Sequence, residues 1–112
     1  MTCFAIDGDT LDCAHERIRI LGVNSPELHG ACAAAAQAAR AFTAAVLRRG
    51  PIIIERLGRD RYGRTLAAVY VGSVSPTNLL AEWIIAAGHG ERYGVPTAVT
   101  RVGRRMPDSC GR

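Results

Sequence analysis

The most evident absence from this sequence is lysine, since all 14 of its basic residues are arginines. Selection for phosphate contacts and a GC-rich genome are alternative explanations, because arginine and lysine differ at phosphate sites. Long apolar runs are also absent, and nothing approaches the roughly 20 apolar residues of a membrane span. The sequence therefore predicts a soluble chain without a membrane partner, and its formal charge of +4 favours polyanionic partners.

The four cysteines include no Cys-x-x-Cys pair, which argues against a zinc knuckle or a thioredoxin-like site. Four cysteines allow three pairings. Cys3 and Cys13 are equally far from Gly8, so a hairpin that turns there places them opposite each other on antiparallel strands. Cys32 is then left with Cys110.

Such disulfides would indicate a secreted or periplasmic protein. Residues 1–6, however, leave no room for a signal peptide before the first motif. Four reduced thiols in an intracellular protein are the alternative, and the sequence leaves the compartment open.

Five short segments rich in aliphatic and β-branched residues are typical of strands, namely residues 1–6, 10–13, 17–23, 52–57 and 65–71. An alanine-rich helix is predicted over residues 30–49, and Gly50 and Pro51 end it. Its apolar stripe is expected at Ala35, Ala39, Phe42 and Val46.

A second helix is predicted from Ser75, as N-cap, and Pro76 to the C-cap Gly88. Its buried face is expected to comprise Leu80, Trp83, Ile84 and Ala87.

The predicted order is three strands, a helix, two strands and a helix, followed by an irregular tail over residues 94–112. Chains of this length form one domain, so we expect residues 1–112 to form a single unit. The order favours a mainly β, α+β fold, namely a five-stranded Greek-key barrel of the OB type with flanking helices.

Three polar segments carry the candidate chemistry: residues 7–10 (DGDT), 19–27 (RILGVNSPE) and 60–64 (DRYGR). Together they supply carboxylates and arginines, which can hold a hard cation, bind a phosphate and activate a water. Each segment taken alone could equally build a turn. Their combination favours a site for phosphodiester hydrolysis, because the reaction needs positive charge at the phosphate oxygens and a positioned water.

In the order and approximate spacing of these segments, and in the later helix ending Ala-Ala-Gly, the chain resembles the staphylococcal nuclease (thermonuclease) family over about residues 3–93. The resemblance implies an OB barrel with flanking helices. It also implies calcium-dependent cleavage of DNA and/or RNA to 5'-hydroxyl and 3'-phosphate ends. We expect a monomer whose substrate partner is nucleic acid.

The resemblance also implies residue roles. Calcium would be held by the Asp9 carboxylate, the Asn24 side chain and the Ser25 backbone carbonyl. The catalytic positions are Glu27, at the carboxylate that orients or deprotonates the attacking water, and Arg19 and Arg64, which bind the phosphate. Tyr62 and Tyr93 are further candidates for substrate binding, by stacking on bases.

Asn24 departs from the family pattern, which has aspartate at this position. Calcium affinity depends on the charge of the ligands, so we expect weakened metal binding rather than its loss. The departure keeps open an alternative function, namely a catalytically weakened or inactive module that binds nucleic acid or protein.

Overall fold

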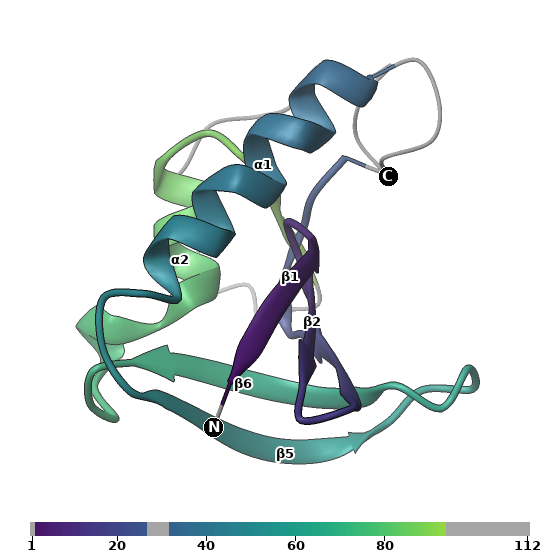
Figure 1. The fold of residues 1–112 in the computed structure, drawn as a ribbon, viewed down its shortest axis with the longest axis vertical. Helices are drawn as coiled ribbons and strands as arrows, with labels where there is room; N and C mark the ends of the chain where they lie inside the picture. The colour runs from purple at the N-terminus through teal and green to yellow at the C-terminus, as the bar shows by residue number, and fades with distance from the viewer. Residues whose placement is uncertain (1, 27–31, 94–112) are drawn as a thin grey trace.

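The computed structural model describes residues 2–26 and 32–93, in which strands predominate and two α-helices pack beside them (Figure 1). The strands are β1 (Cys3–Asp7), β2 (Thr10–Cys13), β3 (Glu16–Ile20), β4 (Gly22–Asn24), β5 (Ile52–Arg59), β6 (Thr65–Val71) and β7 (Glu91–Tyr93). The helices are α1 (Ala33–Val46), α2 (Leu80–Ala86) and a 3₁₀ helix, η1 (Pro76–Asn78). None of the helices in these ranges is long and apolar enough to span a membrane.

The main sheet has five strands in the order β1-β2-β3-β6-β5. Strands β1, β2 and β3 are antiparallel neighbours, β3 pairs in parallel with β6, and β6 pairs antiparallel with β5. This order confirms the predicted OB-like α+β fold. Strands β1 and β5 are the two edges of the sheet in the described residues, so no strand pairing there closes the sheet into a barrel.

The predicted third strand, residues 17–23, is divided into two. Strand β3 ends at Ile20, and Gly22 adopts a φ of 96°, which turns the chain into β4. Strand β4 then pairs with β7 in a separate two-stranded sheet, with Gly22 opposite Tyr93. This small sheet was not predicted, because three-residue strands leave too short a pattern to recognise.

The buried face of α1 differs from the predicted stripe. The buried residues are Ala36, Ala39, Thr43 and Val46, whereas Ala35 and Phe42 are only partly buried. Thr43 belongs to this face because its Oγ1 donates to the carbonyl of Gly8 at 2.8 Å. The buried face of α1 therefore includes a polar residue, which the pattern of apolar residues does not predict.

The second helix begins later than predicted. Ser75 caps η1, where its Oγ accepts from the N–H of Thr77, and α2 follows from Leu80. The buried residues of α2 are Leu80, Ala81, Ile84 and Ile85. The prediction was wrong for Ala87, which is exposed. Trp83 is only partly buried, and its Nε1 donates to the Thr77 carbonyl at 2.7 Å.

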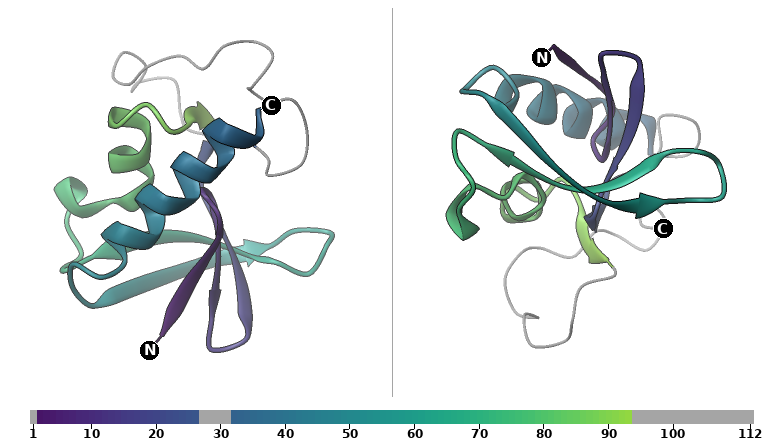
Figure 2. Two further views of the ribbon diagram at one scale, coloured as in Figure 1. Left: turned by 45° about the horizontal axis from the view of Figure 1, so that its top comes forward. Right: turned by 90° about the horizontal axis from the view of Figure 1, so that it is seen from below.

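One apolar core joins the sheet to the helices, which lie together on one side of β5 and β6 (Figure 2). Its fully buried members include Leu11, Ile18, Ile20, Val69 and Ile84. These side chains come from β2, β3, β6 and α2, so the core fixes the strands that carry the polar segments.

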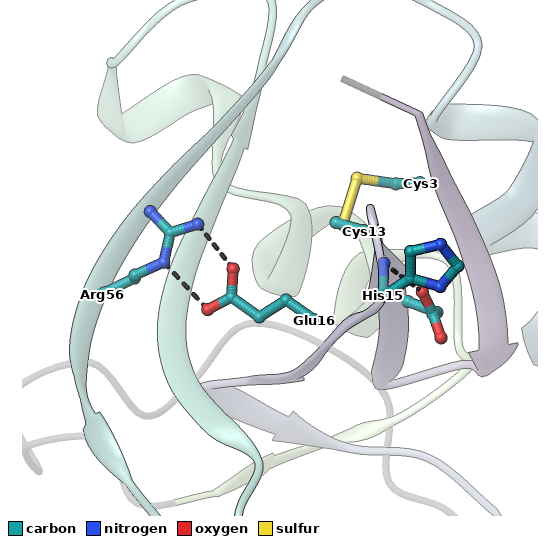
Figure 3. The surroundings of a disulfide bond; sticks show 6 residues. Cys3, Cys13, His15, Glu16 and Arg56 are labelled. Atoms are coloured by element: carbon teal, nitrogen blue, oxygen red, sulfur yellow. Dashed lines mark hydrogen bonds and ion pairs between the residues drawn. A yellow bond between two sulfur atoms is a disulfide. The ribbon is translucent and has the colours of Figure 1, made fainter.

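The first hairpin is cross-linked as predicted. Cys3 lies opposite Cys13, with their Cα atoms 4.1 Å apart, and a disulfide joins them (Figure 3). Cys32 is also disulfide-bonded, and its predicted partner Cys110 lies outside the described residues.

A carboxylate on β3 ties three strands together. Glu16 accepts two hydrogen bonds from the Arg56 guanidinium of β5, at 2.6 and 2.9 Å (Figure 3), and one from Thr65 of β6 at 2.7 Å. The bonds from Arg56 are the main cause that lowers the pKa of Glu16 from 4.5 to about 2, and the bond from Thr65 adds to them.

This pKa predicts how stability depends on pH. A carboxyl group with a pKa of about 2 in the folded state and 4.5 in the unfolded state stabilises the fold fully above its unfolded pKa. The stabilisation is lost as the pH falls toward the folded value. We expect Glu16→Gln to lower the Tm at neutral pH, and the difference from wild type to shrink as the pH falls from about 4.5 to about 2 in thermal melts.

Glu55→Gln on β5 is the matched control. Its carboxylate makes only a 3.4 Å contact with the Tyr70 hydroxyl and no ion pair within the described residues, so we expect little effect at either pH. A Tm difference for Glu16→Gln that is as large at acid pH as at neutral pH would contradict the role of the Glu16 charge.

Candidate active-site cleft

A cleft of about 510 Å³ brings together residues from two of the three polar segments and from β7. The predicted site residues in its lining are Arg19, Asn24, Tyr62, Arg64 and Tyr93. Asp9 and Ser25 are 1 % exposed and lie in the protein interior instead. Glu27 lies outside the described residues.

The sheet topology explains why segments far apart in sequence meet here. Arg19 on β3 lies opposite Thr10 of β2 and opposite Leu66 of β6. Arg64 immediately precedes β6, so it reaches the same end of the sheet as Arg19. The pairing of β4 with β7 brings Tyr93 to the same cleft.

The guanidinium of Arg19 is held on several sides. Its Nη1 donates to the carbonyls of Ile20 at 2.6 Å and Val23 at 2.8 Å. Its Nη2 donates to the side-chain oxygen of Asn24. The side chain is only 9 % exposed, so these contacts compensate the cost of burying its charge and fix the direction of the fork.

Asp9 lies behind Arg19 and links the first hairpin to the segment after β4. Its Oδ2 accepts from the backbone N–H of Ser25 at 2.8 Å and lies 3.6 Å from Arg19 Nη2. Its Oδ1 accepts from the Thr10 hydroxyl at 3.0 Å. The carboxylate therefore positions both Arg19 and Ser25.

Gly8 permits this arrangement by its lack of a side chain. A Cβ built at Gly8 would lie 2.5 Å from Ser25 Oγ and 2.8 Å from the Cβ of Ala39 on α1. The turn between β1 and β2 therefore packs directly against α1 and Ser25, which holds Asp9 in place.

Arg64 is oriented by Asp60 within the turn between β5 and β6. Asp60 Oδ2 accepts from Arg64 Nε at 2.7 Å, and Oδ1 accepts from the backbone N–H groups of Tyr62 and Arg64, both at 2.9 Å. Burial raises the pKa of Asp60, but these N–H groups together lower it below its ordinary value. Sequence reasoning did not assign this role to Asp60, although an aspartate that opens a glycine-containing turn is the signal for it.

Two exposed aromatic rings border the cleft. Tyr62 is 71 % exposed, and Arg64 Cζ lies 5.8 Å from its ring centroid. Tyr93 is 57 % exposed, with Arg19 Cζ 5.9 Å from its ring. Arg61 also lines the cleft, with its Cζ 5.2 Å from the Tyr62 ring centroid, so all three cleft arginines are within cation–π distance of a ring open to solvent.

The predicted ligands, a carboxylate, an amide oxygen and a backbone carbonyl, have the chemistry of a hard-cation site. Asp9 Oδ2 and Asn24 Oδ1 both contact Arg19 Nη2, so the guanidinium occupies the position between these two oxygens. Carboxylate and amide oxygens are ligands that calcium prefers. The described residues contain no group of three or more His, Cys, Asp and Glu side chains that could hold a metal.

Comparison with known proteins gives a family match and two curated relatives. The family model described as staphylococcal nuclease homologue matches residues 17–97. The chain is 30 % identical over 92 residues to the succinoglycan biosynthesis protein ExoI of Rhizobium meliloti (strain 1021). That match covers 75 % of the chain and 47 % of the relative. It is 34 % identical over 70 residues to protein ParB of Escherichia coli, and that match covers 59 % of the chain and 38 % of the relative.

The chain thus spans about half the length of these relatives or less. The family match begins in β3 and extends past β7, so it includes Arg19, Asn24, Tyr62, Arg64 and Tyr93 of the cleft. On this match, and on a fold that agrees with it, the chain belongs to the family of staphylococcal nuclease homologues.

Proposed function

We propose that the chain is a calcium-dependent nuclease that hydrolyses phosphodiester bonds in DNA or RNA and leaves 5'-hydroxyl and 3'-phosphate ends. The observation that carries the proposal is the pair of arginines in one cleft, Arg19 and Arg64. Each comes from a different segment and has its own carboxylate neighbour, Asp9 at 3.6 Å and Asp60 at 2.7 Å. Two fixed cations in one cleft suit a phosphodiester, whose negative charge grows in the transition state.

The two arginines have different tasks in this proposal. Arg64 uses Nε for Asp60, and within the described residues its terminal N–H groups have no protein acceptor, so they are available to a phosphate oxygen. Arg19 is anchored by carbonyls and by Asn24, so it presents positive charge at a fixed position with little reorganisation.

Tyr62 and Tyr93 would bind the nucleotides on either side of the phosphate. Their exposed rings offer flat surfaces on which bases of any identity can stack. Base stacking does not involve the 2'-hydroxyl that distinguishes RNA from DNA, so the proposal includes both as substrates.

Asp9, Asn24 and the Ser25 carbonyl would hold the calcium ion, and the ion, when bound, supplies positive charge that stabilises the phosphate oxygens. Glu27 would accept a proton from the attacking water or orient it. It follows Ser25 by two residues, and the hydrogen bond from Ser25 to Asp9 fixes the chain at that point.

A binding module without catalysis is the second candidate. Two observations favour it: Asn24 brings no charge, and its oxygen already accepts a hydrogen bond from Arg19. In that case the same cleft would bind nucleic acid through its arginines and tyrosines and cleave nothing.

Cleavage of labelled single-stranded DNA separates the two candidates. We expect cleavage in calcium and none in excess chelator, with Glu27→Gln lowering the rate by about 100-fold or more, as loss of a general base does. Glu55→Gln, an exposed carboxylate on β5, is the control and should cleave at the wild-type rate. Tight binding without cleavage in calcium would contradict the enzyme and favour the module.

Substitutions at Asn24 test its predicted place in the metal site. Asn24→Asp adds a charged oxygen at the same position, so we expect a lower calcium concentration for half-maximal cleavage. Asn24→Ala removes the oxygen and should raise that concentration. If both variants require the same calcium concentration as wild type, Asn24 is not a ligand and serves only to hold Arg19.

A further inference from the structure

A second cleft, of about 760 Å³, lies between the start of β1, the C-terminal half of α1 and the start of β5. It shares no lining residue with the candidate active site. Its lining includes Arg40 of α1 and Arg48, which follows the end of α1 by two residues, and it contains no acidic residue. Within the described residues neither arginine forms an ion pair, so the cleft carries positive charge without a counter-charge.

The cleft lies beside the two edge strands of the main sheet in the described residues. These edge strands are β1 and β5, and α1 packs against β1 (Figure 1). Arg40 Nε donates to the Ala5 carbonyl at 3.2 Å, which holds the guanidinium over the edge of β1. Arg40 is exposed despite this anchor, so its terminal N–H groups can reach a ligand.

Phe4 adds an aromatic surface to the same cleft. It alternates with the buried Ala5 along β1, so its ring points away from the core and is 64 % exposed. A single exposed aromatic residue is ordinary on a protein surface. Here Phe4 lines the same cleft as two arginines that form no ion pair in the described residues.

We propose that this second cleft binds single-stranded nucleic acid, with phosphates at Arg40 and Arg48 and a base stacked on Phe4. Aromatic rings beside a positively charged groove are the usual means by which proteins hold single strands. An acidic peptide could use the arginines, but it has no need of the ring. The proposal goes beyond the nuclease function, because this cleft can bind a strand whether or not the first cleft cleaves one.

An amide-shift titration of ¹⁵N-labelled protein tests the location directly. The probe is a hexathymidylate, added in excess chelator so that it stays intact. We expect shifts at the amides of Phe4, Ala44 and Ile52, which line the second cleft. The shifts should persist in Arg64→Gln, a variant of the first cleft. Absence of these shifts would overturn the proposal.

Charge and ring variants test the chemistry. Arg40→Gln combined with Arg48→Gln should weaken binding of a longer oligothymidylate about tenfold and reduce the slope of log affinity against log salt by about 1.4, for two phosphate contacts. The control, Arg17→Gln with Arg56→Gln, removes the same charge from residues paired with Asp12 and Glu16, and should retain the wild-type slope. An equal loss of slope in both double variants would contradict the site.

Phe4→Leu should weaken binding about fivefold or more, because one base loses its stacking surface, whereas Phe4→Tyr should retain it. Equal affinity of the Leu and Tyr variants would overturn the stacking role. Polyglutamate that shifts the same amides where the oligothymidylate does not would instead assign the cleft to acidic protein segments. Cleavage without shifts at Phe4 would refute this proposal alone, and shifts without cleavage would refute only the nuclease function.

Discussion

The burial of one guanidinium, that of Arg19, constrains most of the candidate site. A buried charge is costly unless hydrogen-bond acceptors surround it. The carbonyls of Ile20 and Val23 and the side chain of Asn24 accept from Arg19, and Asp9 lies beside it. The turn from β3 to β4 and the first hairpin must therefore keep their relative positions for the charge to remain compensated.

The rest of the scaffold supports this arrangement. Gly8 lets the hairpin approach Ser25 and Ala39, and Thr43 of α1 donates to the Gly8 carbonyl. The Cys3–Cys13 disulfide constrains the other end of the same hairpin. The hairpin that carries Asp9 is thus held by packing, by a helix contact and by a covalent link. Asp9 in turn positions Arg19 and Ser25 through its Oδ2. Arg64 needs no such support, because Asp60 orients it within a single turn.

Features with a local or symmetric signal were predictable from the sequence. The Cys3–Cys13 register follows from their equal distance from Gly8, and β6 follows from a mostly apolar run that ends at Gly72. Features decided by tertiary contacts were not. Thr43 lies on the buried face of α1 because of its bond to Gly8, and the pairing of β4 with β7 joins two strands of three residues from distant parts of the chain. The sequence predicted that Arg19, Arg64 and the tyrosines would act together, and the structure places them in one cleft. It also places Asp9 in the interior behind Arg19, an arrangement that no pattern of residues indicated.

The most direct test of the role of the Arg19 guanidinium is the single-turnover cleavage rate of Arg19→Lys in saturating calcium, compared with that of Arg17→Lys. Lysine keeps the charge but cannot reach the Ile20 and Val23 carbonyls and Asn24 at once, because it lacks the planar fork. We expect Arg19→Lys to lose about 100-fold or more in rate, in line with other fixed donors at a transition-state charge, and to melt at a lower temperature. Arg17→Lys, on the same strand but half exposed, should match wild type in both. An Arg19→Lys variant that cleaves at the wild-type rate would contradict the central place of the Arg19 guanidinium.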